Sequence, residues 1–226
     1  MYRYETHLHT APVSRCAAVG VRETLEFYKS LGYDGVFITN HFLDGNINID
    51  DKSMPYKDKI EFYFSDYEAG VEIGKELGIK VFCGVELSYG GTDFLVYGLD
   101  KEWFLAHPEI MDMTKSEELP FLAENGALVV QAHPYRQDRH IDHIRLFPHC
   151  IEGVETVNAG RTELENRMAD IFADAYGFVK TAGSDNHTAS KQTHLAGMES
   201  ETPLVDETDF IRRVRNGEMK IFTLDI

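Results

Sequence analysis

Four times along the chain, a helix-like segment ends in a glycine, and an apolar run follows within a few residues. Gly32 precedes the run at 36–38, Gly78 the run at 81–82, Gly126 the run at 128–130, and Gly177 the run at 178–179. Glycine is the usual residue just past a helix C-terminus, because it adopts the left-handed backbone conformation without strain. Strands that alternate with helices in this way predict parallel βα units and an α/β fold.

The apolar runs and the helix starts define the expected elements. Two helix starts carry the Thr-x-x-Glu pattern of a capping box, at Thr114 with Glu117 and at Thr162 with Glu165. Mostly βα connections between the strands predict a closed or nearly closed barrel, in a single domain over residues 1–226. We expect a surface loop at 44–58, strands near 2–8, 35–40, 80–87, 93–98, 127–132, 151–157 and 178–183, and helices near 21–31, 65–77, 114–125, 163–176 and 206–216.

Composition limits the classes of function. With 226 residues, of which 43% are hydrophobic, the chain is long enough to bury the core of one large domain. The formal net charge of −16 disfavours extended nucleic acid as a partner, although cations bound in a pocket would still admit a small anionic substrate. No apolar run is long enough to span a bilayer and no signal-peptide pattern is seen, so we expect no membrane partner and a cytoplasmic location. Reduced thiols are expected at Cys16, Cys83 and Cys150, because they are widely spaced and odd in number.

His7 and His9 stand one residue apart at the end of the first expected strand. Alternate residues of a strand point to the same face, so both imidazoles can project to one point. Further residues of metal-ligating types close later apolar runs in the same way, namely His41, Glu86, His133, Asp185 and His187. Because the C-terminal ends of parallel barrel strands meet at one face, we expect all of these candidate ligands to surround a single site.

The ligand types suggest which metals this site would take. Neutral imidazoles and carboxylates suit Zn, Mn or Fe. The seven candidate ligands are too many for one ion, so we expect two or three divalent ions, with Glu86 as the best candidate to bridge a pair. Bridged ions can share a hydroxide, lower the pKa of bound water and stabilise both the entering and the leaving oxygen. The pattern therefore predicts hydrolysis, most naturally of a phosphate ester.

Taken in order, the motifs His-x-His-Thr, Ile-Thr-Asn-His, Gly-Val-Glu, Ala-His-Pro and Gly-Ser-Asp-x-His resemble those of the PHP family, named for polymerase and histidinol phosphatase. The resemblance covers residues 3 to about 197. It implies an α/β fold that is a distorted seven-stranded (β/α) TIM-like barrel, with a two- or three-metal phosphoesterase site. It also places all seven candidate ligands in the family's metal-ligand motifs.

Three positions depart from the family's pattern. Members with three metals often carry a further His or Asp where this chain has Ser14 and Arg15. A further His often follows the glutamate, whereas the nearest donors here are Asp93 and Asp100, of which Asp100 is the candidate ligand. The second motif has Asn40 in place of an aspartate, which keeps a hydrogen-bonding side chain and removes a charge.

Residues outside the ligand motifs are candidates for other roles. A guanidinium can bind phosphate oxygens in a fork, and Arg136 is the first choice for this role, followed by Arg15, with Arg161 in another loop. His194 or His140 could protonate the leaving group if it lies within hydrogen-bond reach. Glu5 shares a strand face with His7 and is a candidate to orient an imidazole.

The sequence therefore predicts a metal-dependent hydrolase that cleaves a small phosphomonoester, similar to histidinol phosphatase, by a metal-bound hydroxide. A nuclease or phosphodiesterase acting on short oligonucleotides is one alternative. A non-catalytic metal-binding PHP module and an amidohydrolase are the others. The sequence leaves the substrate, the metal and the oligomeric state open.

Overall fold

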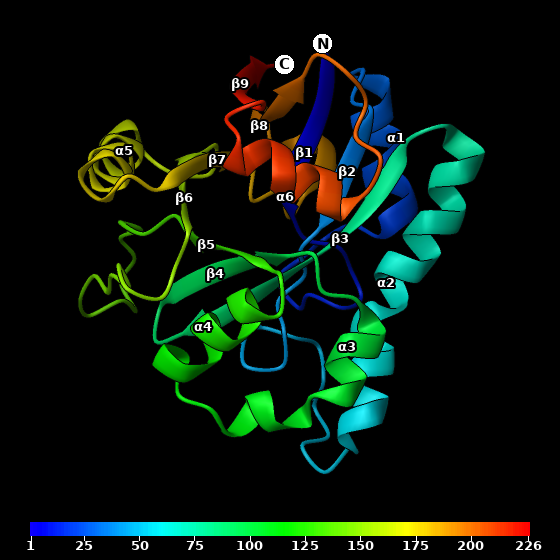
Figure 1. The fold of residues 1–226 in the computed structure, drawn as a ribbon. Coiled ribbons are helices and arrows are strands. Elements are labelled where there is room, and N and C mark those ends of the chain that lie inside the picture. The colour runs from blue at the N-terminus through cyan, green and yellow to red at the C-terminus, as the bar shows by residue number, and fades with distance from the viewer.

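A single sheet of nine strands, in the order β7-β6-β5-β4-β3-β2-β1-β8-β9, forms the centre of the protein (Figure 1). The computed structural model describes residues 1–226. The strands are β1 (Tyr2–Leu8), β2 (Gly35–Ile38), β3 (Lys80–Tyr89), β4 (Thr92–Tyr97), β5 (Leu128–Ala132), β6 (Gly153–Asn158), β7 (Val179–Gly183), β8 (His194–Ser200) and β9 (Lys220–Asp225). The helices are α1 (Val21–Ser30), α2 (Tyr56–Leu77), α3 (Lys101–Ala106), α4 (Lys115–Glu124), α5 (Glu163–Tyr176) and α6 (Glu207–Arg215), with short 3₁₀ helices at Pro108–Asp112 and Ala189–Lys191.

The sheet curls so that β7 returns to β1 and nearly closes a barrel. The Thr6 hydroxyl donates to the Ala182 carbonyl at 2.5 Å, and Leu8 forms an isolated parallel bridge with Asn186. The first half of β1 pairs instead with β8 through Tyr2–Tyr4. Strand β1 therefore changes neighbours along its length, and its end, which carries the His-x-His motif, lies beside the end of β7.

The expected seven-stranded count is corrected to nine. All seven expected strands are present, but β8 pairs antiparallel with β1, and β9 pairs antiparallel with β8. Neither strand was expected, because β8 is short of β-branched residues and both lie outside the βα pattern. They extend the sheet beyond the barrel on the β1 side.

Strand β4 departs from the parallel pattern, because it runs antiparallel to both β3 and β5. The turn from β3 into β4 contains Gly90 and Gly91, both with positive φ, which only glycine adopts easily. The start of β4 therefore lies at the same end of the barrel as the C-terminal ends of β3 and β5. This end, where the parallel strands finish, is called the mouth below.

Helices differ from expectation in two places. Helix α2 begins at Tyr56, earlier than the expected 65, so it takes up the end of the expected 44–58 loop. Helix α3 was not expected, and Asp100 begins it as the N-cap residue by accepting from the Trp103 N–H at 2.9 Å. The two predicted capping boxes, at Thr114 and at Thr162, are confirmed.

Packed aromatic rings fill the barrel below the mouth. The rings of Phe37, Phe82 and Tyr97 are buried, and Phe37 lies 4.5 Å from Phe210 of α6, measured between ring centroids. Helix α6 thus closes the N-terminal end of the barrel, while α1 and α2 line one side of the sheet and α5 lies on the opposite side (Figure 1). None of the helices has the length and apolar composition needed to cross a bilayer.

An ion-pair network anchors α6. The carboxylate of Asp209 accepts from Arg213 Nε and from Arg212 Nη2, both at 2.9 Å, and from the Val205 backbone N–H at 3.1 Å. Burial by itself would raise the pKa of Asp209, but these donors outweigh it and lower the pKa to about 2. Because this pKa lies below the usual value of an aspartate, the ionised form stabilises the folded state.

Asp209→Asn is expected to lower the free energy of unfolding by about 1–2 kcal/mol at pH 7, after allowance for solvent screening. The contribution of Asp209 is fully present above about pH 4, the range of an unfolded aspartate, and is lost as the pH falls toward 2. Urea denaturation of the variant and the parent over this range should show the difference shrinking with acid. A difference that stays constant down to the acid limit of cooperative unfolding would contradict this account.

Candidate metal centre

The structure brings all seven candidate ligands together at the mouth. Their donor atoms form three overlapping groups, within each of which the atoms lie within 4.8 Å of one another. The groups are His7 with Glu86 and His133, His7 with His9 and Asp185, and His9 with His41 and His187. Asp185 also reaches His133, at 3.8 Å from Oδ2 to Nε2. We call these seven residues the ligand cluster.

Glu86 lies between two sets of imidazoles and is buried. Its Oε1 is 3.1 Å from His7 Nε2 and 3.5 Å from His133 Nε2. Its Oε2 is 2.7 Å from His41 Nδ1 and 3.3 Å from His9 Nε2. Each carboxylate oxygen thus faces a different part of the ligand cluster, which is the arrangement that a bridging ligand requires.

Two ligands hold unusual backbone conformations. His133 has φ 28° and Asp185 has φ 53°, values in the left-handed region that residues other than glycine rarely adopt. Asp185 is thereby placed with Oδ1 3.5 Å from His7 Nε2 and 3.4 Å from His9 Nε2. Such strain persists where the surrounding structure enforces it, and it gathers at functional sites.

The spacing of donor atoms fits divalent ions. Ligand atoms at about 2.0–2.2 Å from one ion lie roughly 3.0–3.5 Å from each other, for octahedral to tetrahedral angles. The distances from His7 Nε2 to Glu86 Oε1 and to Asp185 Oδ1, 3.1 and 3.5 Å, fall in this range. Glu86 Oε2 and His41 Nδ1 are moreover both buried without a hydrogen-bond partner, although only 2.7 Å separates them. A buried acceptor without a partner is costly, and a cation would satisfy it.

Hydrogen bonds donated by Nδ1 prepare three of the imidazoles to bind a metal through Nε2. His7 Nδ1 lies 2.9 Å from Glu155 Oε1, His187 Nδ1 lies 2.8 Å from the Asp185 carbonyl oxygen, and His9 Nδ1 lies 3.2 Å from Ser14 Oγ. With the proton on Nδ1 donated to these oxygens, Nε2 keeps its lone pair for a metal.

Charges in the ligand cluster shift the pKa values of its members in both directions. Burial lowers the pKa values of His7, His41 and His133, but the carboxylates beside them raise these values above the usual one, that of His41 to about 11. Burial by itself would raise the pKa of Glu86, but the imidazoles of His41, His7 and His9 outweigh it and lower the pKa to well below its usual range. Burial, together with His187 and His41, lowers the pKa of His9 to about 3. At neutral pH the cluster therefore holds an ionised carboxylate beside a neutral imidazole.

Glu155 on β6 is a site residue that sequence reasoning missed. It is fully buried, and in addition to His7 it binds the backbone N–H of His133 at 3.1 Å and Asn158 Nδ2 at 2.8 Å. The Gly-Val-Glu sequence at 153–155 repeats the one that ends in Glu86, and this was the signal available. A buried carboxylate on a ligating imidazole fixes the orientation of the ring and raises its basicity.

Glu5 was expected to orient an imidazole, but it binds backbone N–H groups and a tyrosine hydroxyl instead. Its Oε1 accepts from the backbone N–H groups of His7 and Ser184, both at 2.9 Å, and its Oε2 accepts from the Tyr28 hydroxyl at 2.9 Å. Burial raises its pKa to about 7. Glu5 therefore ties the end of β1 to the segment after β7 and does not touch a ligand ring.

Ser14 and Asn40 are occupied by hydrogen bonds within the protein. The Ser14 hydroxyl donates to Asn40 Oδ1 at 2.8 Å and accepts from the His41 backbone N–H at 3.1 Å. Asn40 Nδ2 donates to Asp66 Oδ2 at 3.3 Å. An aspartate at position 40 would place its charge against Asp66, which gives a physical reason for the asparagine.

Asp100 is not at the mouth, which corrects the expectation that it is a ligand. Because β4 is antiparallel, its end lies at the other end of the barrel, where Asp100 caps α3. Asp93, near the start of the same strand, is the residue that reaches the ligand cluster. It is buried, and its Oδ2 lies 3.9 Å from His133 Nε2 and 3.2 Å from Arg136 Nη1.

The candidate cations and proton donors are spread more widely. Arg136 contacts the cluster through Asp93, and Nε of both Arg136 and Arg161 is buried without an acceptor. Arg15 is half-exposed and paired with Asp50 at 2.6 Å. His194 and His140 are exposed and paired with other carboxylates, at 2.6 and 3.5 Å, and neither contacts a ligand. The catalytic roles of Arg136, Arg15 and His194 stay predictions.

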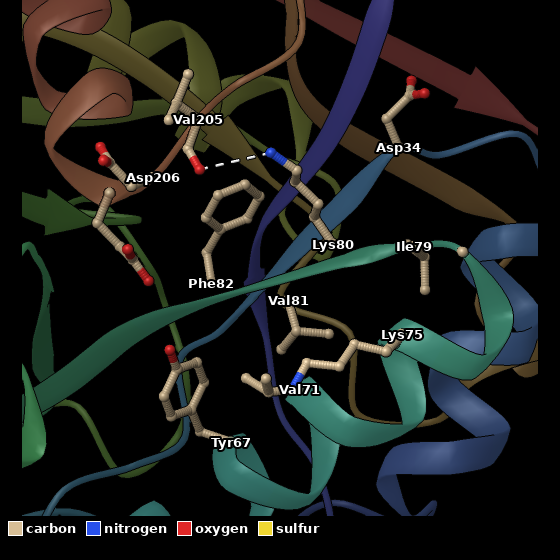
Figure 2. Close-up of a pocket in the computed structure, with 13 residues that line it drawn as sticks. Asp34, Tyr67, Val71, Lys75, Ile79, Lys80, Val81, Phe82, Val205 and Asp206 are labelled. Carbon is tan, nitrogen blue, oxygen red and sulfur yellow. Dashed lines mark hydrogen bonds between the residues drawn. The ribbon is translucent and has the colours of Figure 1, made fainter.

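A pocket of about 410 Å³ lies far from the ligand cluster, at the N-terminal ends of β2 and β3 (Figure 2). Its only cation at the sheet, Lys80, donates to the carbonyl oxygens of Leu204 at 2.6 Å and Val205 at 3.5 Å. This contact ties the start of β3 to the segment before α6. In barrels of this type the N-terminal end serves stability and the mouth serves function, so we assign this pocket no role in the chemistry.

The mouth of this α/β barrel gathers imidazoles and carboxylates around a buried glutamate. The fold and the site together therefore define a candidate metal-binding barrel. A family model described as PHP-associated matches residues 163–219, from α5 through α6. No curated protein matches the chain.

Solved structures share the fold at low sequence identity. A two-domain protein from Bacteroides vulgatus, containing a predicted PHP-like metal-dependent phosphoesterase, is 12% identical with a TM-score of 0.69, over 98% of this chain and 64% of that one. A candidate metal-dependent phosphoesterase from Bifidobacterium adolescentis is 13% identical with a TM-score of 0.58, over 93% and 94%. An amidohydrolase from Chromobacterium violaceum, with bound sulfate and no metal, is 12% identical with a TM-score of 0.57, over 96% and 97%.

These findings confirm the resemblance to the PHP family and give the chain the fold of PHP-like metal-dependent phosphoesterases. The chain spans 64% of the length of the first of these structures.

Proposed function

We propose that the protein is a metal-dependent phosphoesterase that hydrolyses a small phosphomonoester. The observation that carries the proposal is the position of Glu86, whose two oxygens face separate sets of imidazoles at the barrel mouth. Two or three divalent ions held there, Zn, Mn or Fe, would lower the pKa of water and neutralise the charge of a phosphate. His7, His9, His41, Glu86, His133, Asp185 and His187 would hold these ions.

The protein's own cations would hold the phosphate against the ligand cluster. Arg136 is fixed on one side by Asp93, and its buried Nε still lacks an acceptor. Arg161, whose Nε is also buried without an acceptor, adds a second guanidinium in the loop after β6. Guanidinium groups bind phosphate oxygens in a fork and stabilise the charge of the transition state. The sulfate bound by the C. violaceum relative supports binding of a tetrahedral anion in this fold.

A pocket beside the mouth would take the organic part of the substrate. Gly45 lines it and packs against His41, whose Cβ lies 3.2 Å from the position of a Cβ on Gly45. The pocket has a volume of about 570 Å³, with apolar walls and two lysines, formed by Leu43, Gly45, Ile47, Ile49, Lys52, Tyr56, Lys59, Pro108 and Met111. Its size suits a small molecule, and the net charge of −16 disfavours a long polyanion.

Metal removal and reconstitution test the proposal. The protein purified with Mn, Zn or Fe should hydrolyse p-nitrophenyl phosphate and a panel of small phosphomonoesters, lose this activity on chelation and regain it with metal. Activity that survives complete removal of metal would reject the proposal. Turnover confined to phosphodiesters or short oligonucleotides would favour the nuclease alternative, and stoichiometric metal without turnover would favour a non-catalytic module.

An amidohydrolase is the second candidate function. It is favoured by the name of the C. violaceum relative and by the fact that the same nucleophile can attack a carbonyl carbon. A panel of N-acyl amino acids and cyclic amides, run beside the phosphate esters with the same metal-loaded sample, separates the two. Faster turnover of any amide than of all phosphate esters would replace the leading proposal.

Arg136→Ala is expected to raise KM for a phosphomonoester by roughly 10–100-fold, because a charge-assisted hydrogen bond contributes about 1.5–3 kcal/mol. Metal content should be unchanged, since Arg136 contacts the cluster only through Asp93. Steady-state kinetics and metal analysis measure both quantities. The matched control is Arg139→Ala, an exposed arginine in the same loop. Equal kinetics for the two variants would remove Arg136 from the phosphate site.

A further inference from the structure

Helix α5 carries a row of apolar side chains on its outer surface. Leu164, Met168, Ile171 and Ala175 follow one another at spacings of four, three and four residues, which is the heptad pattern of helices that pair with other helices. The side chains of Leu164 and Ile171 are 51% and 54% exposed. Single exposed apolar residues are ordinary, but a continuous row of them marks an interaction surface. We call these four residues the α5 stripe.

The α5 stripe is not the face by which the helix packs on its own chain. Helix α5 lies mainly on β6 and β7, and its buried residues Ala169, Phe172 and Ala173 pack there against Val154. The α5 stripe lies on a neighbouring face of the helix, turned away from the sheet. In Figure 1, α5 stands at the edge of the molecule, on the side opposite α2, and no other helix lies beside it.

The charges that flank the α5 stripe show which partner it fits. Arg167 and Asp174 lie seven residues apart on the same side of the stripe, and both are exposed. Arg167 has no carboxylate partner within its own chain, while Asp174 binds Lys180 through Oδ1 at 2.7 Å and keeps Oδ2 free. Flanking positions of this kind meet across a helix pair and set its orientation. In an antiparallel pair of α5 helices, Arg167 of each copy meets Asp174 of the other, whereas a parallel pair would bring Arg167 against Phe172.

We propose that two copies of this chain associate through their α5 stripes, with the two helices antiparallel about a two-fold axis. Leu164 of one copy then lies opposite Ala175 of the other, and Met168 lies opposite Ile171. Each layer therefore combines a larger side chain with a smaller or stiffer one, and the symmetry makes every contact occur twice. The two ion pairs lie at the border of this apolar contact.

The arrangement leaves the mouths of both barrels open. Each α5 begins at its own mouth, where Glu165 accepts from the Gln137 backbone N–H at 2.7 Å, and runs toward the other end of the barrel. Antiparallel helices therefore direct the two mouths to opposite ends of the dimer. One 14-residue helix from each copy is a small contact, so we expect a dissociation constant in the range of about 1–100 μM. The dimer does not depend on metal binding or on turnover of any substrate.

Sedimentation equilibrium of the full chain, in ~0.15 M salt to screen the repulsion between acidic surfaces, tests the inference. The parent should pass from monomer to dimer between ~1 μM and ~1 mM. Ile171→Glu should raise the dissociation constant by at least about 100-fold, because it buries an unpaired charge twice in the contact. The matched control is Val205→Glu, another exposed apolar residue, which should dimerise like the parent. Thermal melts establish that both variants are folded.

Charge reversal tests the antiparallel arrangement separately. Arg167→Asp should raise the dissociation constant by about 10-fold, and the double variant Arg167→Asp/Asp174→Arg should bring it back toward that of the parent. A chain that stays monomeric up to ~1 mM, or a dimer that Ile171→Glu leaves intact, would overturn the inference. A dimer that Ile171→Glu breaks but that the double variant does not restore would overturn the antiparallel pairing.

Discussion

Glu86→Gln is expected to lower kcat/KM for phosphomonoester hydrolysis by at least about 10³-fold, since the charge stabilisation supplied by a correctly held pair of ions amounts to several kcal/mol. The carboxylate faces His7 and His133 with one oxygen, and His9 and His41 with the other. An amide keeps the size of this side chain but provides a single neutral acceptor, so it cannot bridge two ions. Metal content measured beside kinetics should fall by at least one ion per chain.

Glu118→Gln is the matched control for this variant. Glu118 is also a buried glutamate, but it lies on α4 and binds Lys115. Its replacement should leave both metal content and kcat/KM near those of the parent. If Glu86→Gln retained full metal content and activity, the ligand cluster would not be the catalytic centre.

Glu155→Gln is the second change with a large expected effect, a loss of about 10–100-fold in affinity for the ion bound by His7, as is typical when the partner of a ligating imidazole is altered. The Nδ1 proton of His7 would then face a neutral amide instead of a buried carboxylate 2.9 Å away. The imidazole becomes less basic and its orientation less fixed. Metal titration followed by calorimetry, together with kcat at low and saturating metal, measures the effect.

Recovery of kcat at saturating metal distinguishes this positioning role from a direct one. Glu5→Gln serves as the control, because Glu5 binds backbone N–H groups and the Tyr28 hydroxyl and touches no ligand ring. It should change stability without changing metal affinity. A loss of activity in Glu155→Gln that excess metal does not restore would assign Glu155 a direct part in the reaction.

The ligand cluster shows why part of the site was predictable. His41 and His133 closely follow apolar strands and Glu86 lies near the end of another, and parallel strands of a barrel finish at the same end. A local pattern together with this one architectural rule is enough to bring residues from distant parts of the chain to one place. The glycine-terminated helices supplied the evidence that the rule applies.

The errors share a different cause. Asp100 was chosen over Asp93 because it stands nearer the end of its strand, and only the antiparallel pairing of β4 with β3 and β5 shows that the start of β4 lies at the mouth. Strand direction depends on the partner across the sheet, which a local pattern does not contain. Strands β8 and β9 were missed for a related reason, since β8 is stabilised by pairing with β1, far away in the sequence.

By itself the sequence determined the α/β class, the first seven strands and the seven candidate ligands that the structure brings together at the mouth, because each of these follows from residue type and spacing along one segment. Only the tertiary structure decided that Glu155 supports His7, that Glu5 binds backbone, and that Asp93 reaches His133. These roles depend on distances of a few ångströms between side chains from separate elements. Such distances are set by the packing of the whole barrel, and no segment encodes them alone.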